Sequence, residues 1–117
     1  MTTILNKATF IEKVCDYEKS NGQWQFKGTR PAIIDFFATW CGPCRAMSPL
    51  IDEVSENYAD KIDVYKIDVD AEPELAGLFS IRSIPTLLFI PTTGEPRTQI
   101  GAMQRQLLKE QVEALLK

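Results

Sequence analysis

Two cysteines three positions apart, Cys41 and Cys44, are the strongest candidates for chemistry in this chain. They follow an apolar run, Ile33 to Ala38, that predicts a buried strand, and an amphipathic helical pattern begins directly behind them. At a strand-to-helix junction the first cysteine lies at the helix N-terminus, where free backbone N–H groups and the helix dipole favour a thiolate over a thiol. The second lies about one turn further on, near enough to form a disulfide with the first. The pattern therefore predicts a redox-active pair.

Metal binding and cysteine hydrolysis are the other chemistries that such a pair could serve. The chain has three cysteines and no histidine, so one chain cannot supply the four nitrogen or sulfur ligands of a structural zinc site, although two chains together could. A cysteine hydrolase needs a base, usually histidine, to form its thiolate. Thiol–disulfide exchange needs only an attacking thiol, a resolving thiol and a proton acceptor, and is favoured for that reason.

Two charged residues, Asp35 and Lys66, interrupt apolar strand patterns. Asp35 has the parity of apolar neighbours in its strand, so its carboxylate points into an apolar layer. A buried, unpaired carboxylate is costly and holds its proton more tightly than in water. We therefore interpret Asp35 as a proton carrier for a nearby cysteine, with a satisfied buried ion pair or cap as the alternative. Lys66 either pairs with Asp35 across neighbouring strands or extends to the strand end.

Hydrophobic periodicity predicts the elements that position these residues. The strands are expected at residues 2–5, 32–38, 61–69, 87–90 and 97–100. Helices are expected after Thr9, from the cysteine pair to about Tyr58, and over residues 72–79 and 104–117. Strands alternate with helices through the first two thirds of the chain, and a hairpin and a helix follow. This order predicts an α/β protein with a mixed sheet, and the length predicts one domain, residues 1–117.

Three local features give further expectations. Thr9 and Glu12 fit a capping box in which Thr9 is the N-cap of the first helix. Trp24 and Phe26 alternate with glutamines, which predicts a brief strand or hairpin arm within an otherwise irregular segment. Trp24 is interpreted as a lid on the edge of the core rather than as a recognition residue. Cys15 is interpreted as a small, half-buried hydrophobic residue rather than as a regulatory thiol.

Composition and charge disfavour several classes of function. The net charge of −3 gives no electrostatic footprint for nucleic acid or an anionic membrane. No apolar run approaches the roughly 18 residues that a membrane-spanning helix needs. The first ten residues carry one lysine and lack the apolar stretch of a signal peptide. We therefore expect a cytoplasmic protein, and a periplasmic one only if a signal peptide preceded this sequence and was removed.

The chain resembles thioredoxins across nearly its whole length. The resemblance is carried by residues in the family's order and at close to its spacings: the Asp35 strand, Trp40 to Cys44, Pro49, Lys66, Ile84-Pro85-Thr86 and Gly101-Ala102. It implies a thioredoxin fold, with a central mixed sheet of about five strands flanked by four helices. The segment from Glu18 to Arg30 is longer than in most of the family, as in a subset of bacterial thioredoxins. Phe37 stands where many thioredoxins have a second tryptophan.

The resemblance implies a protein-disulfide reductase that works by dithiol–disulfide exchange. Cys41 would be the exposed nucleophile and Cys44 the buried resolving thiol. Asp35 would lie beneath the pair and take the proton from Cys44, with its pKa tuned by Lys66. Pro85 would follow a cis peptide bond and stand opposite Cys41. The apolar surface for substrate would comprise Trp40, Gly42, Pro43, Ile84, Pro85, Gly101 and Ala102.

The resemblance also implies partners. The substrates would be proteins that contain disulfides, and a flavin- and NADPH-dependent thioredoxin reductase would recycle a monomeric chain that holds no bound cofactor. The Gly-Pro between the cysteines is the dipeptide of the reductants in this superfamily. Two alternatives stay open: an exported reductant or thiol oxidase, and a binding subunit whose partner needs only the fold.

Overall fold

A mixed five-stranded sheet forms the centre of the computed structural model, which describes residues 2–117. The strand order is β1-β3-β2-β4-β5. β1 and β2 run parallel to β3, and β4 runs antiparallel to both β2 and β5. The predicted mixed sheet is thus confirmed. The bounds of the strands are Thr2–Ile4 (β1), Ala32–Phe37 (β2), Asp63–Asp68 (β3), Thr86–Ile90 (β4) and Arg97–Ile100 (β5).

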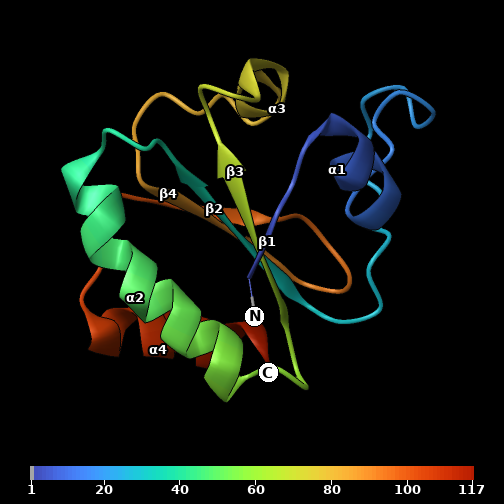
Figure 1. Ribbon diagram of the computed structural model, residues 1–117. Coiled ribbons are helices and arrows are strands. Elements are labelled where there is room, and N and C mark those ends of the chain that lie inside the picture. The colour runs from blue at the N-terminus through green and yellow to red at the C-terminus, as the bar shows by residue number, and fades with distance from the viewer. Residues whose placement is uncertain (1) are drawn as a thin grey trace.

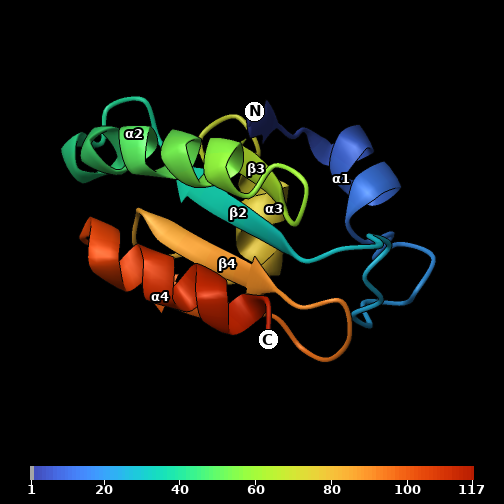
Figure 2. The ribbon, with the colours of Figure 1, turned by 90° about the horizontal axis from the view of Figure 1, so that it is seen from below.

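Four helices cover the two faces of the sheet (Figures 1 and 2). They are α1 (Lys7–Lys13), α2 (Gly42–Asn57), α3 (Pro73–Leu78) and α4 (Arg105–Leu115). α2 and α4 lie on one face, and α1 and α3 lie on the other. β2 lies at the centre of the sheet, between β3 and β4, and the cysteines follow its end at the start of α2. The predicted α/β class with four helices is confirmed.

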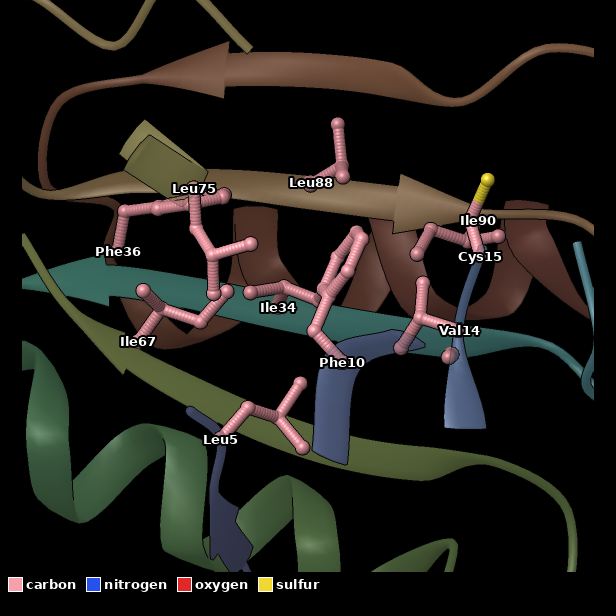
Figure 3. Packing of buried hydrophobic residues seen from close by; sticks show 11 residues of the cluster. Leu5, Phe10, Val14, Cys15, Ile34, Phe36, Ile67, Leu75, Leu88 and Ile90 are labelled. Atoms are coloured by element: carbon pink, nitrogen blue, oxygen red, sulfur yellow. The ribbon is translucent and has the colours of Figure 1, made fainter. Parts of the chain in front are cut away.

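Each face of the sheet has its own hydrophobic core, because successive side chains of a strand point to opposite faces. In β2, Ile33 packs with the α2 and α4 side, whereas Ile34 and Phe36 pack with the α1 and α3 side. Figure 3 shows the second of these cores, where Phe10 from α1 lies against the strands and Leu75 of α3. Cys15 belongs to this core with 2% of its surface exposed. It is a buried hydrophobic residue, more deeply placed than predicted.

The N-terminus of α1 differs from the prediction. Asn6, not Thr9, is the N-cap, and the helix begins at Lys7. The side chain of Asn6 accepts a hydrogen bond from the backbone N–H of Thr9 at 2.9 Å, and the hydroxyl of Thr9 accepts one from the backbone N–H of Asn6 at 2.8 Å. Asparagine is at least as good an N-cap as threonine. Its reciprocal bonds with Thr9 complete the box one turn earlier, and so the predicted box of Thr9 and Glu12 is wrong.

This cap gives a stability prediction that separates the two assignments. Asn6→Ala is expected to lower the free energy of unfolding by about 1 kcal/mol, because one N–H of the first turn loses its acceptor. Glu12→Ala serves as the matched control and is expected to change it by less than about 0.5 kcal/mol. Urea unfolding of both variants checks this. A larger loss for Glu12→Ala than for Asn6→Ala would contradict the Asn6 cap.

The segment between α1 and β2 has no strand at Trp24 and Phe26, so that part of the prediction is wrong. The two rings instead stack on each other, with centroids 6.2 Å apart and planes 5° from parallel. Trp24 also meets Phe79 edge to face at 6.0 Å. The ring therefore covers the edge of the core next to α3, and the lid interpretation of Trp24 is confirmed.

Candidate active site

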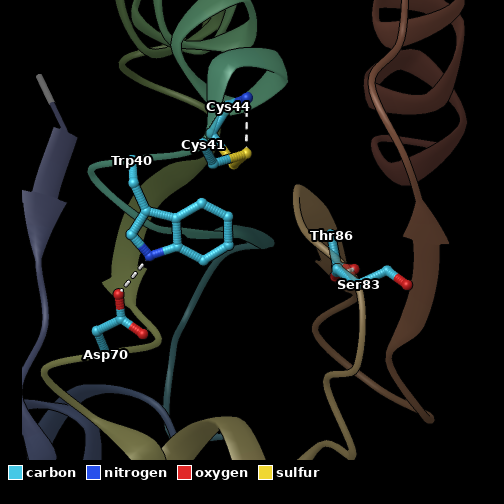
Figure 4. The surroundings of a disulfide bond; sticks show 6 residues. All are labelled: Trp40, Cys41, Cys44, Asp70, Ser83 and Thr86. Atoms are coloured by element: carbon cyan, nitrogen blue, oxygen red, sulfur yellow. Dashed lines mark hydrogen bonds between the residues drawn. A yellow bond between two sulfur atoms is a disulfide. The ribbon is translucent and has the colours of Figure 1, made fainter.

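The cysteine pair lies where the chain passes from the end of β2 into α2. Cys41 is the N-cap of α2 and Cys44 lies in its first turn. Their Cα atoms are 5.2 Å apart and their sulfur atoms are joined in a disulfide. The backbone N–H of Cys44 donates to Cys41 Sγ at 3.2 Å (Figure 4). One of the free N–H groups at the helix start thus already points at the sulfur that would carry a thiolate charge.

Both cysteines are buried in the disulfide form, with 4% of Cys41 and 3% of Cys44 exposed. They form a small cluster with Ala38, against which Phe37 and Ile84 pack. The expectation of an exposed Cys41 is therefore wrong for this form. The physical reason is that the bond to Cys44 holds the Cys41 sulfur in the turn, under these apolar neighbours.

The loop before β4 lies across from the disulfide (Figure 4). The Ile84–Pro85 peptide bond is cis. Ile84 is half-buried against the cysteine cluster, and Pro85 is buried. The hydroxyl of Thr86 donates to the Ser83 carbonyl at 2.6 Å, and the N–H of Gly101 donates to the Pro85 carbonyl at 2.8 Å. These bonds fix the loop against β4 and the end of β5.

The predicted contact surface is only partly exposed. Trp40 keeps 66% of its surface in solvent, and Gly42, Pro43 and Ala102 are exposed, whereas Gly101 is half-buried. Two exposed or interacting residues were missed by the sequence reasoning. Ile100, 68% exposed, lies directly before Gly101. The carboxylate of Asp70 accepts a hydrogen bond from Trp40 Nε1 at 2.7 Å and so orients the indole (Figure 4).

Asp35 and Lys66 lie side by side near Cys44. They are register partners on the parallel strands β2 and β3, so their side chains share a face of the sheet. Both line a cavity of about 270 Å³ together with Cys44. The structure therefore brings together three of the predicted catalytic residues that are far apart in the sequence.

No ion pair joins Asp35 and Lys66 in the part of the chain that the structure describes. Asp35 is 1% exposed, and its Oδ1 atom has no hydrogen-bond partner among residues 2–117. The ammonium of Lys66 instead donates to Ser48 Oγ at 2.9 Å and lies 3.8 Å from Asp52 Oδ1. The sequence analysis did not identify Ser48 and Asp52 as contacts of Lys66. They hold its ammonium toward α2 rather than toward Asp35.

Comparison with known proteins places this site in a family. The family model described as Thioredoxin matches residues 3–114. The chain is 44% identical over 104 residues to a thioredoxin of Borreliella burgdorferi, covering 89% of this chain and 88% of the relative. It is 44% identical over 97 residues to a thioredoxin of Alicyclobacillus acidocaldarius, covering 83% and 89%.

The chain belongs to the thioredoxin family. It also shares 46% identity over 83 residues with a chloroplastic M-type thioredoxin of Pisum sativum, of whose length the match covers 48%. Thioredoxins are protein-disulfide reductases that use a cysteine pair and no cofactor. With its Cys41–Cys44 disulfide, the chain is a dithiol–disulfide oxidoreductase of this kind, and both the predicted fold and the predicted activity are confirmed.

Burial gives Asp35 a proton affinity suited to exchange chemistry near neutral pH. Removal from water raises the pKa of Asp35 from 3.8 to about 6, while Lys66 opposes the rise and Asp52 adds to it. A carboxyl group with a pKa near 6 is a stronger base than an exposed one and can take up a proton from a thiol. The thioredoxin disulfide thus has, on the side of Cys44, a buried carboxyl group whose pKa is raised.

Two further findings concern the described part of the chain. No group of three or more histidine, cysteine, aspartate or glutamate side chains within residues 2–117 is placed to hold a metal ion. Among the helices of the same residues, none is long and apolar enough to cross a membrane.

Proposed function

We propose that this thioredoxin-family chain is a general reductant of protein disulfides in which Cys41 attacks and Cys44 resolves. The Cys41 thiolate attacks one sulfur of a substrate disulfide, and the other substrate sulfur leaves as a thiolate and is protonated. The Cys44 thiolate then attacks the Cys41 sulfur. The mixed disulfide breaks, the Cys41–Cys44 disulfide forms, and the substrate leaves with both thiols reduced. Two electrons pass from the pair to the substrate.

The observation that carries this assignment is the different placement of the two cysteines. Cys41 caps α2, where the Cys44 N–H donates to its sulfur, and this supports stabilisation of a Cys41 thiolate and the role of nucleophile. Cys44 lines the cavity of Asp35 and Lys66, and this supports transfer of its proton to Asp35. Lys66 is proposed to tune the proton affinity of Asp35 through its positive charge.

The proposed substrate surface surrounds the disulfide. An extended substrate segment is expected to pair with backbone groups of Ile84 and to pass close to Gly101. Gly101 has a φ of +94°, and no heavy atom beyond Gly101 and its two chain neighbours lies within 4 Å of the position that a Cβ would take. A substrate backbone can therefore approach it closely. Trp40, Gly42, Pro43, Pro85 and Ala102 are proposed to complete this surface.

The partners and the setting are also proposals. Substrates are expected to be disulfide-containing proteins, and a flavin- and NADPH-dependent thioredoxin reductase is expected to regenerate the dithiol. Residues 1–117 are proposed to act as a single-domain monomer. A cytoplasmic location suits a reductant, because thiols are kept reduced there.

Coupled turnover tests this function. The purified chain is expected to accelerate the reduction of insulin disulfides by dithiothreitol. It is also expected to support NADPH oxidation when a bacterial thioredoxin reductase and insulin are both supplied. Insulin reduction without NADPH-dependent recycling would support disulfide reduction by the chain but contradict thioredoxin reductase as its partner. No acceleration in either assay would contradict the proposed function.

A further inference from the structure

Ser48 lies between the exchange site and the surface of α2. It follows Cys44 by four residues and precedes Asp52 by four, so the three share one face of the helix. Ser48 is half-buried and lines the cavity that also contains Asp35 and Lys66. Its hydroxyl is thus the one polar group of this helix face that lies beside the cavity and also contacts the lysine.

Ser48 is the nearest partner of the Lys66 ammonium. The Nζ–Oγ distance is 2.9 Å, whereas the distance to Asp52 Oδ1 is 3.8 Å. The Asp52 side chain is 56% exposed, so solvent weakens its attraction for the lysine. The Lys66 side chain is only 13% exposed, and a buried ammonium strongly requires an acceptor.

Asp35 is the competing acceptor for Lys66. Asp35 is the register partner of Lys66 on the neighbouring strand, and it lines the same cavity. One oxygen of its carboxylate has no hydrogen-bond partner within residues 2–117. A lysine side chain has enough rotatable bonds to turn toward either group. In the structure the ammonium donates a hydrogen bond to Ser48, and Asp35 Oδ1 has no hydrogen-bond partner within residues 2–117.

We propose that Ser48 is a positioning residue for thiol–disulfide exchange, whose hydroxyl holds the Lys66 ammonium against α2 and prevents it from pairing with Asp35. This inference rests on the proposed role of Asp35 as the proton acceptor of Cys44. A carboxylate that pairs with an ammonium is a weaker base than one left unpaired in an apolar site. Ser48 therefore keeps Asp35 a strong enough base to serve the resolving thiol.

The other charged and titratable groups around Asp35 do not take over the role of the Ser48 hydroxyl. From α2, Cys44 and Arg45 line the cavity, and Asp52 raises the Asp35 pKa through its negative charge. From β3 the charged neighbour is Lys66, and β4 places the apolar Leu87 at the register position. Of these groups, the Lys66 ammonium is the positive charge that the structure already shows restrained by a hydrogen bond.

The test is a pH titration of the Asp35 carboxyl by carbon NMR in the oxidised protein, where Cys41 and Cys44 are joined in a disulfide and do not titrate. Ser48→Ala is expected to lower the Asp35 midpoint by at least about half a pH unit, because Lys66 turns to the carboxylate. Ser48→Thr restores the hydroxyl and is expected to titrate within about 0.2 units of the unaltered chain. Ser55→Ala, at a buried serine of the same helix, is the matched control and is expected to cause no shift.

A double-mutant comparison excludes a merely structural effect. With Lys66→Met in place, Ser48→Ala is expected to leave the Asp35 midpoint unchanged, since the hydroxyl acts through the ammonium. An unchanged or raised midpoint in Ser48→Ala, or an equal shift in the Lys66→Met background, would overturn the proposal. The titration does not depend on turnover. A lowered midpoint together with normal exchange in Asp35→Asn would therefore overturn the proton-acceptor role while the position of Lys66 stands.

Discussion

Cys41→Ser is expected to lower insulin reduction by at least about a thousandfold, as loss of the nucleophile does in other enzymes that act through a covalent intermediate. A serine hydroxyl cannot exchange with a disulfide sulfur, and no mixed disulfide with substrate can form. The measurement is the initial rate of insulin reduction with dithiothreitol, after subtraction of the rate without protein.

Cys44→Ser separates the roles of the two thiols. It is expected to lose turnover as well, but to accumulate a mixed disulfide between Cys41 and substrate, visible by mass spectrometry, because the resolving thiol is missing. Cys15→Ser is the control, since Cys15 is buried in the α1 and α3 core, and it is expected to retain turnover. A trapped adduct in Cys41→Ser instead of Cys44→Ser would reverse the assignment of nucleophile and resolving thiol.

Asp35→Asn is expected to slow the resolution of the mixed disulfide by about tenfold to a hundredfold at neutral pH. This loss of rate lies at or below the low end of the rate enhancement that a positioned general base usually provides. It is small because Cys44 can still lose its proton to water. The loss is expected to shrink as the pH rises toward the thiol pKa. Stopped-flow measurement of single-turnover exchange between about pH 6 and about pH 9 checks this profile. A rate ratio that is constant with pH would contradict the proton-acceptor role.

The same variant is expected to stabilise the oxidised protein at neutral pH. The Asp35 pKa is raised from 3.8 to about 6, so between these values the folded state binds more protons than the unfolded state. The free energy of unfolding therefore falls as the pH rises through this window, by about 3 kcal/mol in all. Asparagine carries no charge and removes this loss.

Urea unfolding of both proteins measures the effect. Asp35→Asn is expected to exceed the unaltered chain by about 2–3 kcal/mol at about pH 8, and by much less at about pH 4. Taking the difference between the two proteins cancels the titration of the other carboxyl groups, such as Glu74, whose pKa is lowered by Tyr17 and Lys7. If the variant and the unaltered chain had equal free energies of unfolding at both pH values, the charged Asp35 carboxylate would not be destabilised by burial.

The placement of the central residues could be predicted from the sequence because it follows from local rules. The alternation of side chains along a strand put Asp35 in an apolar layer, and the residue is buried. The strand-to-helix junction put Cys41 at a helix start, and it is the N-cap of α2. For Lys66 the sequence left two options, pairing with Asp35 or extension to the strand end. The sequence could not decide between them, because the register between strands depends on the whole sheet.

The residues that were missed depend on contacts between distant elements. Asp70 follows β3 and meets Trp40 only through the fold. Ser48 and Asp52 are ordinary polar residues of an amphipathic helix until β3 brings Lys66 beside them. The alternation of Trp24 and Phe26 resembled a strand, but ring stacking and the contact with Phe79 account for it. Tertiary packing overrides local pattern at such positions.

The reduction potential of the Cys41–Cys44 couple tests most directly whether the chain donates electrons to protein disulfides. Equilibration with a glutathione buffer of known composition, followed by quantification of the free thiols, gives the value. We expect a reduction potential of about −270 mV, the value known for thioredoxins. A value of about −120 mV, at the strong-oxidant end of the superfamily, would mean that the pair oxidises thiols and would contradict the proposed reductase.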